Sequence, residues 1–64
     1  MVKINGKMLD ISGTSLSGYL TDAGYDPARI AVEINGEIVP KSSYDERLLC
    51  DGDTVEVVSF VGGG

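Results

Sequence analysis

The chain has 64 residues, of which 42% are hydrophobic, and a formal net charge of −5. A chain of this length makes one small domain with a single shared core. Its acidic balance disfavours a nucleic-acid partner and favours a protein partner with a basic docking face. The sequence contains no histidine, the commonest general base and metal ligand, so we expect no catalytic residue, metal site or bound cofactor.

The single cysteine, Cys50, excludes a disulfide within the chain and suits a reducing compartment. The sequence does not open on a signal-peptide pattern, and no apolar run approaches membrane-spanning length. We therefore expect a cytoplasmic protein with no membrane partner. No basic residue is adjacent to Cys50 in the sequence, so this side chain is expected to pack as a small apolar group rather than to react.

A hairpin is expected at the start of the chain. Val2 and Ile4 alternate with a polar residue, and Asn5-Gly6 follows them. Asn-Gly is a strong hairpin signal because a type I′ turn needs positive φ at both central positions. The pattern predicts strands over about residues 1–5 and 7–11.

A helix is expected next. Apolar residues recur at i, i+3, i+4 and i+7, which places them on one helical face: Leu16, Tyr19, Leu20 and Ala23. Thr14 is a suitable N-cap, and Gly24 is placed to close the helix in a left-handed conformation. Gly18 weakens the helix interior, and its missing side chain is expected to allow close packing on a sheet.

The second half of the chain predicts three more strands. Over residues 30–34 large apolar residues occupy every second position, which is the pattern of a half-buried strand. A second Asn-Gly turn at 35–36 leads to a short return strand that Pro40 ends. The β-branched run over about 54–61 is the last strand. Between them, serines precede acidic residues at capping-box spacing over 42–46, which predicts one helical turn. Asp51 and Asp53 are interpreted as turn residues rather than as metal ligands.

This order of elements predicts an α+β fold. It consists of one mixed sheet of four to five strands with one main helix on one face. The last strand is expected to lie parallel beside the first, because the intervening helix supplies the crossover that parallel pairing needs.

The last strand has two different faces. Val55, Val57 and Val61 alternate on one face and are expected in the core. Val58 and Phe60 alternate on the other. If the helix covers only one side of the sheet, these two side chains are exposed just before the end of the chain. They are then either ordinary surface apolar residues or an anchor for a docking partner.

The chain ends on three glycines, Gly62, Gly63 and Gly64. Composition alone leaves three interpretations open: a frayed end, a cloning remnant, or a tail that carries a reactive terminal carboxylate into a narrow partner site. We expect a domain over residues 1–61 and a flexible tail over 62–64.

Three stretches resemble one known family: VEINGEIVPKSSY, LLCDGDTVEVVSFV and the final VGGG. They are similar to the ThiS family of sulfur carrier proteins of thiamin biosynthesis, within the ubiquitin-like β-grasp superfamily. The match covers essentially the whole chain. Molybdopterin-synthase small subunits and ubiquitin-like modifiers share the fold and the ending. The molybdopterin relatives usually run longer, often with Pro-Pro before the end, and this chain shows neither feature.

The resemblance implies a protein co-substrate rather than an enzyme. An E1-like, ThiF-like adenylyltransferase would use ATP to activate the carboxylate of Gly64, and a sulfur donor such as a cysteine desulfurase would convert it into a thiocarboxylate. A ThiG-like thiazole synthase would then receive the sulfur. Gly62 and Gly63 would thread through the partner's active site, and Val58 and Phe60 would contribute to docking. The alternatives are a molybdopterin-type sulfur carrier and a ubiquitin-like modifier or binding module.

Overall fold

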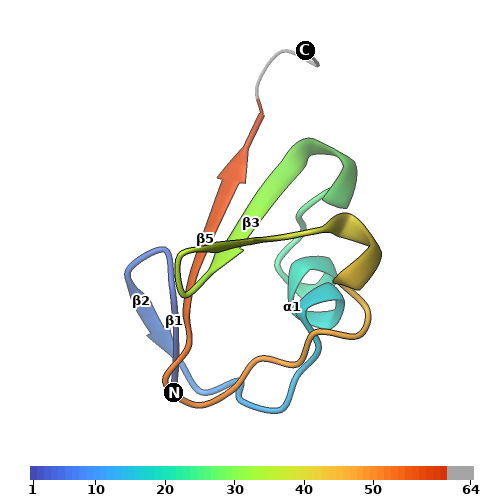
Figure 1. The fold of residues 1–64 in the computed structure, drawn as a ribbon. Helices are drawn as coiled ribbons and strands as arrows, with labels where there is room; N and C mark the ends of the chain where they lie inside the picture. The colour runs from blue at the N-terminus through green and yellow to red at the C-terminus, as the bar shows by residue number, and fades with distance from the viewer. Residues whose placement is uncertain (61–64) are drawn as a thin grey trace.

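The computed structural model describes residues 1–60, which form one five-stranded mixed sheet with a helix against one face (Figure 1). The strands are β1 (Val2–Ile4), β2 (Lys7–Leu9), β3 (Ile30–Ile34), β4 (Glu37–Val39) and β5 (Thr54–Ser59). The helices are α1 (Leu16–Asp22) and two 3₁₀ helices, η1 (Pro27–Arg29) and η2 (Lys41–Ser43). The strand order across the sheet is β2-β1-β5-β3-β4. The predicted arrangement of one mixed sheet and one main helix is confirmed.

Strand β5 is the central strand and joins the two hairpins. It pairs in parallel with β1, with Lys3 opposite Thr54. On its other side it pairs antiparallel with β3 over the whole length of β3, from Ile30 opposite Ser59 to Ile34 opposite Val55. The predicted parallel pairing of the first and last strands is therefore confirmed.

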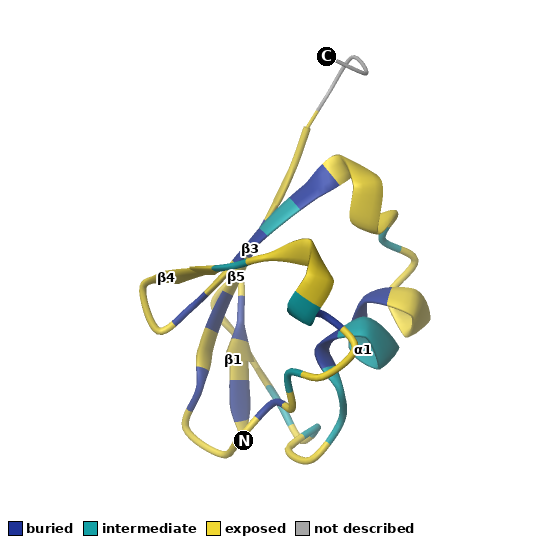
Figure 2. Ribbon diagram, turned by 45° about the vertical axis from the view of Figure 1, so that its right-hand side comes forward, coloured by how far each residue is buried: buried dark blue, intermediate teal, exposed yellow. Residues whose placement is uncertain are grey.

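The core lies between the sheet and α1 (Figure 2). Its buried members come from alternate strand positions, from one side of the helix and from the segment between η2 and β5: Val2, Ile4, Leu16, Leu20, Ile30, Val32, Ile34, Tyr44, Leu49, Val55 and Val57. Alternation arises because successive strand side chains point to opposite faces of a sheet. The buried strand side chains therefore lie on the face that α1 covers, and their neighbours lie on the other face.

Both predicted Asn-Gly turns are present, and each asparagine also bonds to β5. Asn5 and Asn35 have positive φ, 49° and 54°. The Asn5 side chain accepts a hydrogen bond from the Val57 amide at 2.8 Å and donates one to the Val57 carbonyl at 3.3 Å. The Asn35 side chain accepts a hydrogen bond from the Thr54 amide at 3.0 Å. The two turns thus fix both hairpins to the central strand.

The start of α1 differs from the predicted one, whereas its end is as predicted. Ser15, not Thr14, is the N-cap, and its hydroxyl accepts a hydrogen bond from the Gly18 amide at 3.0 Å. The missing side chain of Gly18 makes room for this cap rather than for the sheet, because a Cβ there would lie 2.9 Å from the Ser15 Oγ. The helix ends at Asp22 with Ala23 as the C-cap, and Gly24 follows with the predicted positive φ of 83°. Ala23, predicted on the apolar face, is exposed.

Other boundaries also shift. Strand β2 ends at Leu9 instead of residue 11, and β5 ends at Ser59. The predicted helical turn exists as η2, but it begins at Lys41 and no side chain caps it, so the capping box is not formed. Helix η1 was not predicted; the Asp26 carboxylate caps it by accepting the Ala28 amide at 3.0 Å. Val61, placed in the core by its sequence position, lies outside the described residues.

Candidate functional site

The candidate site is the end of β5, where the described chain stops. The last backbone hydrogen bond of this strand region runs from the Phe60 amide to the Arg29 carbonyl at 2.8 Å. The end of β5 lies at the opposite side of the molecule from the N-terminus (Figure 1). The proposed reactive residue Gly64 and the tail residues Gly62 and Gly63 lie outside the described residues.

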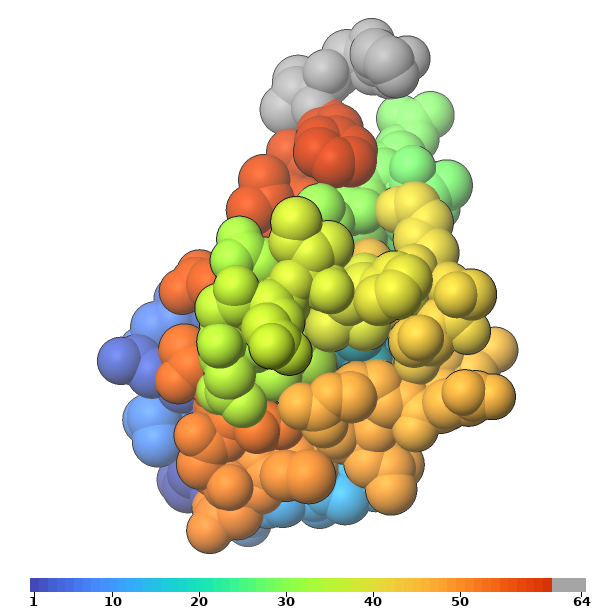
Figure 3. Space-filling model, in the orientation of Figure 1, coloured from blue at the N-terminus to red at the C-terminus, as the bar shows by residue number. Residues whose placement is uncertain are grey.

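The sheet face opposite α1 is uncovered beside this end. We call it the open face; its members on and beside β5 are Lys3, Ala31, Glu33, Ile38, Thr54, Glu56, Val58 and Phe60. Val58 and Phe60 are 54% and 53% exposed. Their predicted exposure is confirmed, because α1 packs only on the other face. The end of β5 reaches the molecular surface next to the start of β3 (Figure 3).

Cys50 does not belong to this site. Its side chain is exposed, and its Sγ contacts the Leu48 carbonyl oxygen at 3.7 Å, so the expectation that it packs as a small apolar group is wrong. The adjacent Leu49 takes the core position and is fully buried. Cys50 precedes β5, whereas Phe60 follows it. A six-residue strand separates them by about 20 Å, too far for the thiol to act at the chain end.

Asp53 is a structural carboxylate of the turn before β5. It is buried and accepts hydrogen bonds from the Cys50 amide at 2.9 Å, from the Asn35 side chain at 3.0 Å and from Arg47 at 3.2 Å. Burial alone raises the pKa of Asp53, but these hydrogen bonds and the Arg47 charge together lower the pKa below its usual value. The interpretation of Asp53 as a turn residue is therefore confirmed.

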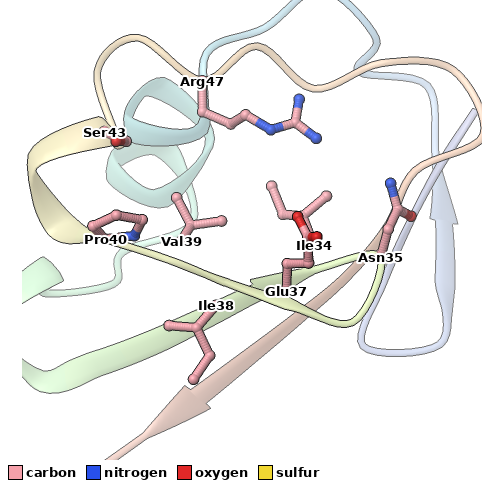
Figure 4. Close-up of a pocket in the computed structure, with 8 residues that line it drawn as sticks. All are labelled: Ile34, Asn35, Glu37, Ile38, Val39, Pro40, Ser43 and Arg47. Carbon is pink, nitrogen blue, oxygen red and sulfur yellow. The ribbon is translucent and has the colours of Figure 1, made fainter.

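A shallow cleft lies elsewhere on the surface, between β4 and the segment after η2 (Figure 4). Its lining residues are Ile34, Asn35, Glu37, Ile38, Val39, Pro40, Ser43 and Arg47. The Arg47 side chain forms one wall, and Ile38 points away from it towards the open face. Ile34 lies at the end of β3 remote from Ser59, so this cleft is remote from the end of β5.

Two other features of residues 1–60 bear on function. No helix in this range is long and apolar enough to cross a membrane. The same residues place no group of three or more His, Cys, Asp or Glu side chains where they could hold a metal ion.

Sequence reasoning missed the side chains that hold β5 in place. Asn5 and Asn35 were interpreted only as turn formers, although the repetition of Asn-Gly before and after α1 was the available signal. It also missed the cross-strand pair of Glu33 and Glu56 on the open face. No local pattern reveals that pair, because it depends on the register between β3 and β5.

The model of the ThiS family matches residues 2–64, nearly the whole chain. This chain belongs to the ThiS family. Two relatives of similar length carry the name sulfur carrier protein ThiS. The one from Bacillus subtilis is 41% identical over 68 residues and is aligned over its whole length, as is this chain. The one from Thermus thermophilus is 36% identical over 64 residues, again over the full length of both chains.

This ThiS-family chain is also similar to part of a longer protein. A thiazole synthase from Paramagnetospirillum magneticum is 45% identical over 62 residues, which are 95% of this chain but 19% of the synthase. The chain thus spans about a fifth of that relative. Among solved structures, ThiS from Geobacter metallireducens has a TM-score of 0.77 at 28% identity, with 98% of this chain and 97% of that chain covered. The ThiS β-grasp fold is thereby confirmed.

Proposed function

We propose that this chain is a sulfur carrier of thiamin biosynthesis whose reactive group is the α-carboxylate of Gly64. The family match over residues 2–64, which includes the three final glycines, carries the proposal. The two relatives named sulfur carrier protein ThiS support it. The described residues agree with it: β5 leads to the chain end beside an uncovered apolar face, and the one thiol lies at the far end of that strand.

The proposed chemistry takes place on the carrier's main chain. A carboxylate is a poor acyl donor, so a ThiF-like, E1-like adenylyltransferase must activate it. A Gly64 carboxylate oxygen attacks the α-phosphorus of ATP, pyrophosphate leaves, and an acyl adenylate forms. A sulfur nucleophile then attacks the acyl carbon and AMP leaves, which yields the thiocarboxylate. Splitting one acyl transfer into two easier steps is the logic of covalent catalysis. The carrier supplies no catalytic side chain and binds no cofactor, and ATP belongs to its partner.

The proposed recipient of the sulfur is a ThiG-like thiazole synthase. A segment similar to nearly all of this chain lies within thiazole synthases from Paramagnetospirillum magneticum and Magnetococcus marinus. The presence of a carrier-like segment and a synthase in one protein supports a reaction in which carrier and synthase act together. The donor that loads the carrier is expected to be a cysteine desulfurase or a similar source of nucleophilic sulfur.

Intact-mass measurement tests the proposal. The 64-residue chain is incubated with a ThiF-like enzyme, ATP and hydrosulfide. We expect the mass to rise by the difference between sulfur and oxygen. Deletion of Gly64, or addition of one bulky residue after it, should abolish the change, because misplacement by about 1 Å can already cost on the order of a hundredfold in rate. Attachment to lysines of other proteins without a thiocarboxylate would instead indicate a modifier.

The cysteine provides a matched control. Cys50→Ser should leave thiocarboxylate formation unchanged, because the thiol is remote from the end of β5. If Cys50→Ser blocks sulfur loading while a chain extended beyond Gly64 is still loaded, the sulfur is carried on the side chain and the proposal is wrong.

A further inference from the structure

The two edges of β5 differ in how far they are paired. The edge towards β3 is paired from Val55 to Ser59. The edge towards β1 is paired only at the start of β5, because the register with β1 ends at Ile4 opposite Val55. Asn5 extends this contact by one step through its side chain, which bonds both backbone groups of Val57. Beyond Val57 the hairpin of β1 and β2 has already turned away.

Ser59 is the next residue whose backbone faces that edge. Hydrogen bonds join β5 to β3 at Phe60 with Arg29 and at Thr54 with Asn35. Residues of β5 with even numbers therefore direct their N–H and C=O groups towards β3, and those with odd numbers direct them towards β1. The Val55 carbonyl accepts the Asn5 amide at 2.9 Å. For the backbone of Ser59, residues 1–60 provide no corresponding partner on this side. We call this position the open edge of β5.

An open strand edge can bind another strand. Its unpaired N–H and C=O groups provide a template for an extended segment of a second protein. Here the edge adjoins the exposed side chains of Val58 and Phe60. Unpaired main-chain groups and an apolar surface are therefore available to a partner at one place, directly before the final residues of the chain.

The charge beside the open edge indicates what kind of segment fits. Glu33 and Glu56 lie directly opposite each other on β3 and β5, and both are exposed on the open face. Like charges in this position destabilise a sheet. Lys3 lies on the same face, opposite Thr54 and diagonal to Glu56, but within residues 1–60 neither glutamate forms a salt bridge with it or with any other cation. A Lys or Arg side chain from a strand added beside β5 lies within diagonal reach of Glu56 and relieves this repulsion.

We propose that an extended, basic segment of the adenylating partner adds a strand to the open edge of β5 at Ser59, with its apolar side chains on Val58 and Phe60 and a cationic side chain near Glu56. This inference rests on the proposed function, because it assigns the partner that activates Gly64. Strand pairing at Ser59 fixes the direction in which the chain leaves the domain.

Two substitutions at one position separate the backbone from the side chain. Ser59→Pro removes the N–H that faces the open edge and breaks no bond to β3, so the domain should keep its fold. Ser59→Ala keeps the N–H and removes only the hydroxyl. With a ThiF-like enzyme, ATP and no sulfur source, we expect Ser59→Pro to weaken complex formation about tenfold, which is what one lost hydrogen bond allows. Ser59→Ala should bind as the wild type does.

Hydrogen exchange tests the same contact without a substitution. In the free wild-type chain the Ser59 amide should exchange rapidly, and the Val57 amide slowly because Asn5 accepts its hydrogen bond. Saturation with the ThiF-like enzyme should slow exchange at Ser59. Unchanged exchange at Ser59 in the complex, or equal affinity of the wild type and Ser59→Pro, would overturn the proposed pairing.

The charge of the segment is tested at Glu56. Glu56→Gln should weaken the complex and reduce the dependence of its affinity on salt, because one interfacial ion pair is lost. Glu37→Gln is the matched control, since Glu37 lies opposite Ile34 and points away from the open face. An unchanged salt dependence for Glu56→Gln would overturn the basic character of the segment. Failure of the wild type to release pyrophosphate from ATP would instead contradict the proposed function itself.

Discussion

At the scale of single residues, polar side chains around β5 have two opposite effects on stability. Asp53 and Asn35 provide satisfied hydrogen bonds at its start, and Asn5 provides them at Val57. Glu33 and Glu56 place like charges opposite each other in its middle. The first group stabilises the sheet and the second destabilises it. This repulsive pair lies on the exposed face, where the proposed docking segment would bring a positive charge close to Glu56.

Glu56→Gln should raise the free energy of unfolding by about 0.2–1 kcal/mol, the usual size of a cross-strand term. The physical reason is that the amide removes the repulsion with Glu33 and keeps the shape of the side chain. Urea denaturation of the free protein measures it. Glu37→Gln, opposite Ile34, should change the stability little. A loss of stability in Glu56→Gln would show that the pair is not repulsive in the folded chain.

Asp53→Asn should destabilise the protein by about 1–3 kcal/mol, because the hydrogen bonds to a charged, buried acceptor are lost. The folded-state pKa of Asp53 is lowered, so its contribution is complete above its unfolded pKa of about 3.9 and is lost as the pH falls through the lower folded value. Denaturation from pH 5 downwards checks this. In Asp53→Asn the acid-induced loss should be smaller, whereas Asp45→Asn, at an exposed position, should keep the wild-type profile.

At the scale of elements, the fold depends on how two hairpins attach to one central strand. The hairpins β1–β2 and β3–β4 make no strand pairing with each other, and β5 lies between them. Each hairpin has an Asn-Gly turn, and each turn asparagine bonds to the backbone of β5. The side chain of Asn5 also completes the pairing of Val57 where β1 has ended. The turn therefore determines where the open edge of β5 begins.

Asn5→Gly should therefore act on β5 rather than on the turn alone. Glycine keeps the positive φ, so the turn can form, but the two bonds to Val57 are lost. We expect a loss of about 1–2 kcal/mol in unfolding free energy and much faster hydrogen exchange at the Val57 amide. Asn35→Gly removes a hydrogen bond at Thr54, the first residue of β5, and should leave the Val57 amide slow to exchange by local opening. Slow exchange at Val57 in Asn5→Gly would contradict the assigned role of the side chain.

At the scale of the whole molecule, the two sheet faces have separate roles. One face holds the core against α1, and the open face presents apolar and acidic side chains next to the end of β5. A small domain needs nearly all of one face for its core, so the other face is available for a partner. The net charge of −5 is consistent with a partner that has a basic surface.

Phe60→Glu should separate these roles. Because Phe60 is half exposed and follows the last strand, the unfolding free energy should change by no more than about 0.5 kcal/mol. Adenylation by a ThiF-like enzyme should slow, because an apolar contact is replaced by a charge. Thermal denaturation and pyrophosphate release measure the two effects. Unfolding of the Phe60→Glu variant would instead place Phe60 in the core.

The sequence by itself determined the order of the strands and of the main helix, both turns, the parallel pairing of the end strands and the alternation of Val55 and Val57 with Val58. These features follow from local backbone preferences and from the period of apolar residues. The residues of the tail could be proposed as the site only because the three quoted stretches resemble a family.

The tertiary structure decided what depends on contacts between distant segments. It placed Ser15 rather than Thr14 at the helix start, because one residue of shift decides which hydroxyl reaches the Gly18 amide. It left Cys50 exposed, because Leu49 takes the neighbouring core position. It also set Glu33 opposite Glu56 and, within residues 1–60, left Ser59 without a paired strand on one side. These last two features depend on strand register and strand length. Register and length are determined only when the separate hairpins pack on one core.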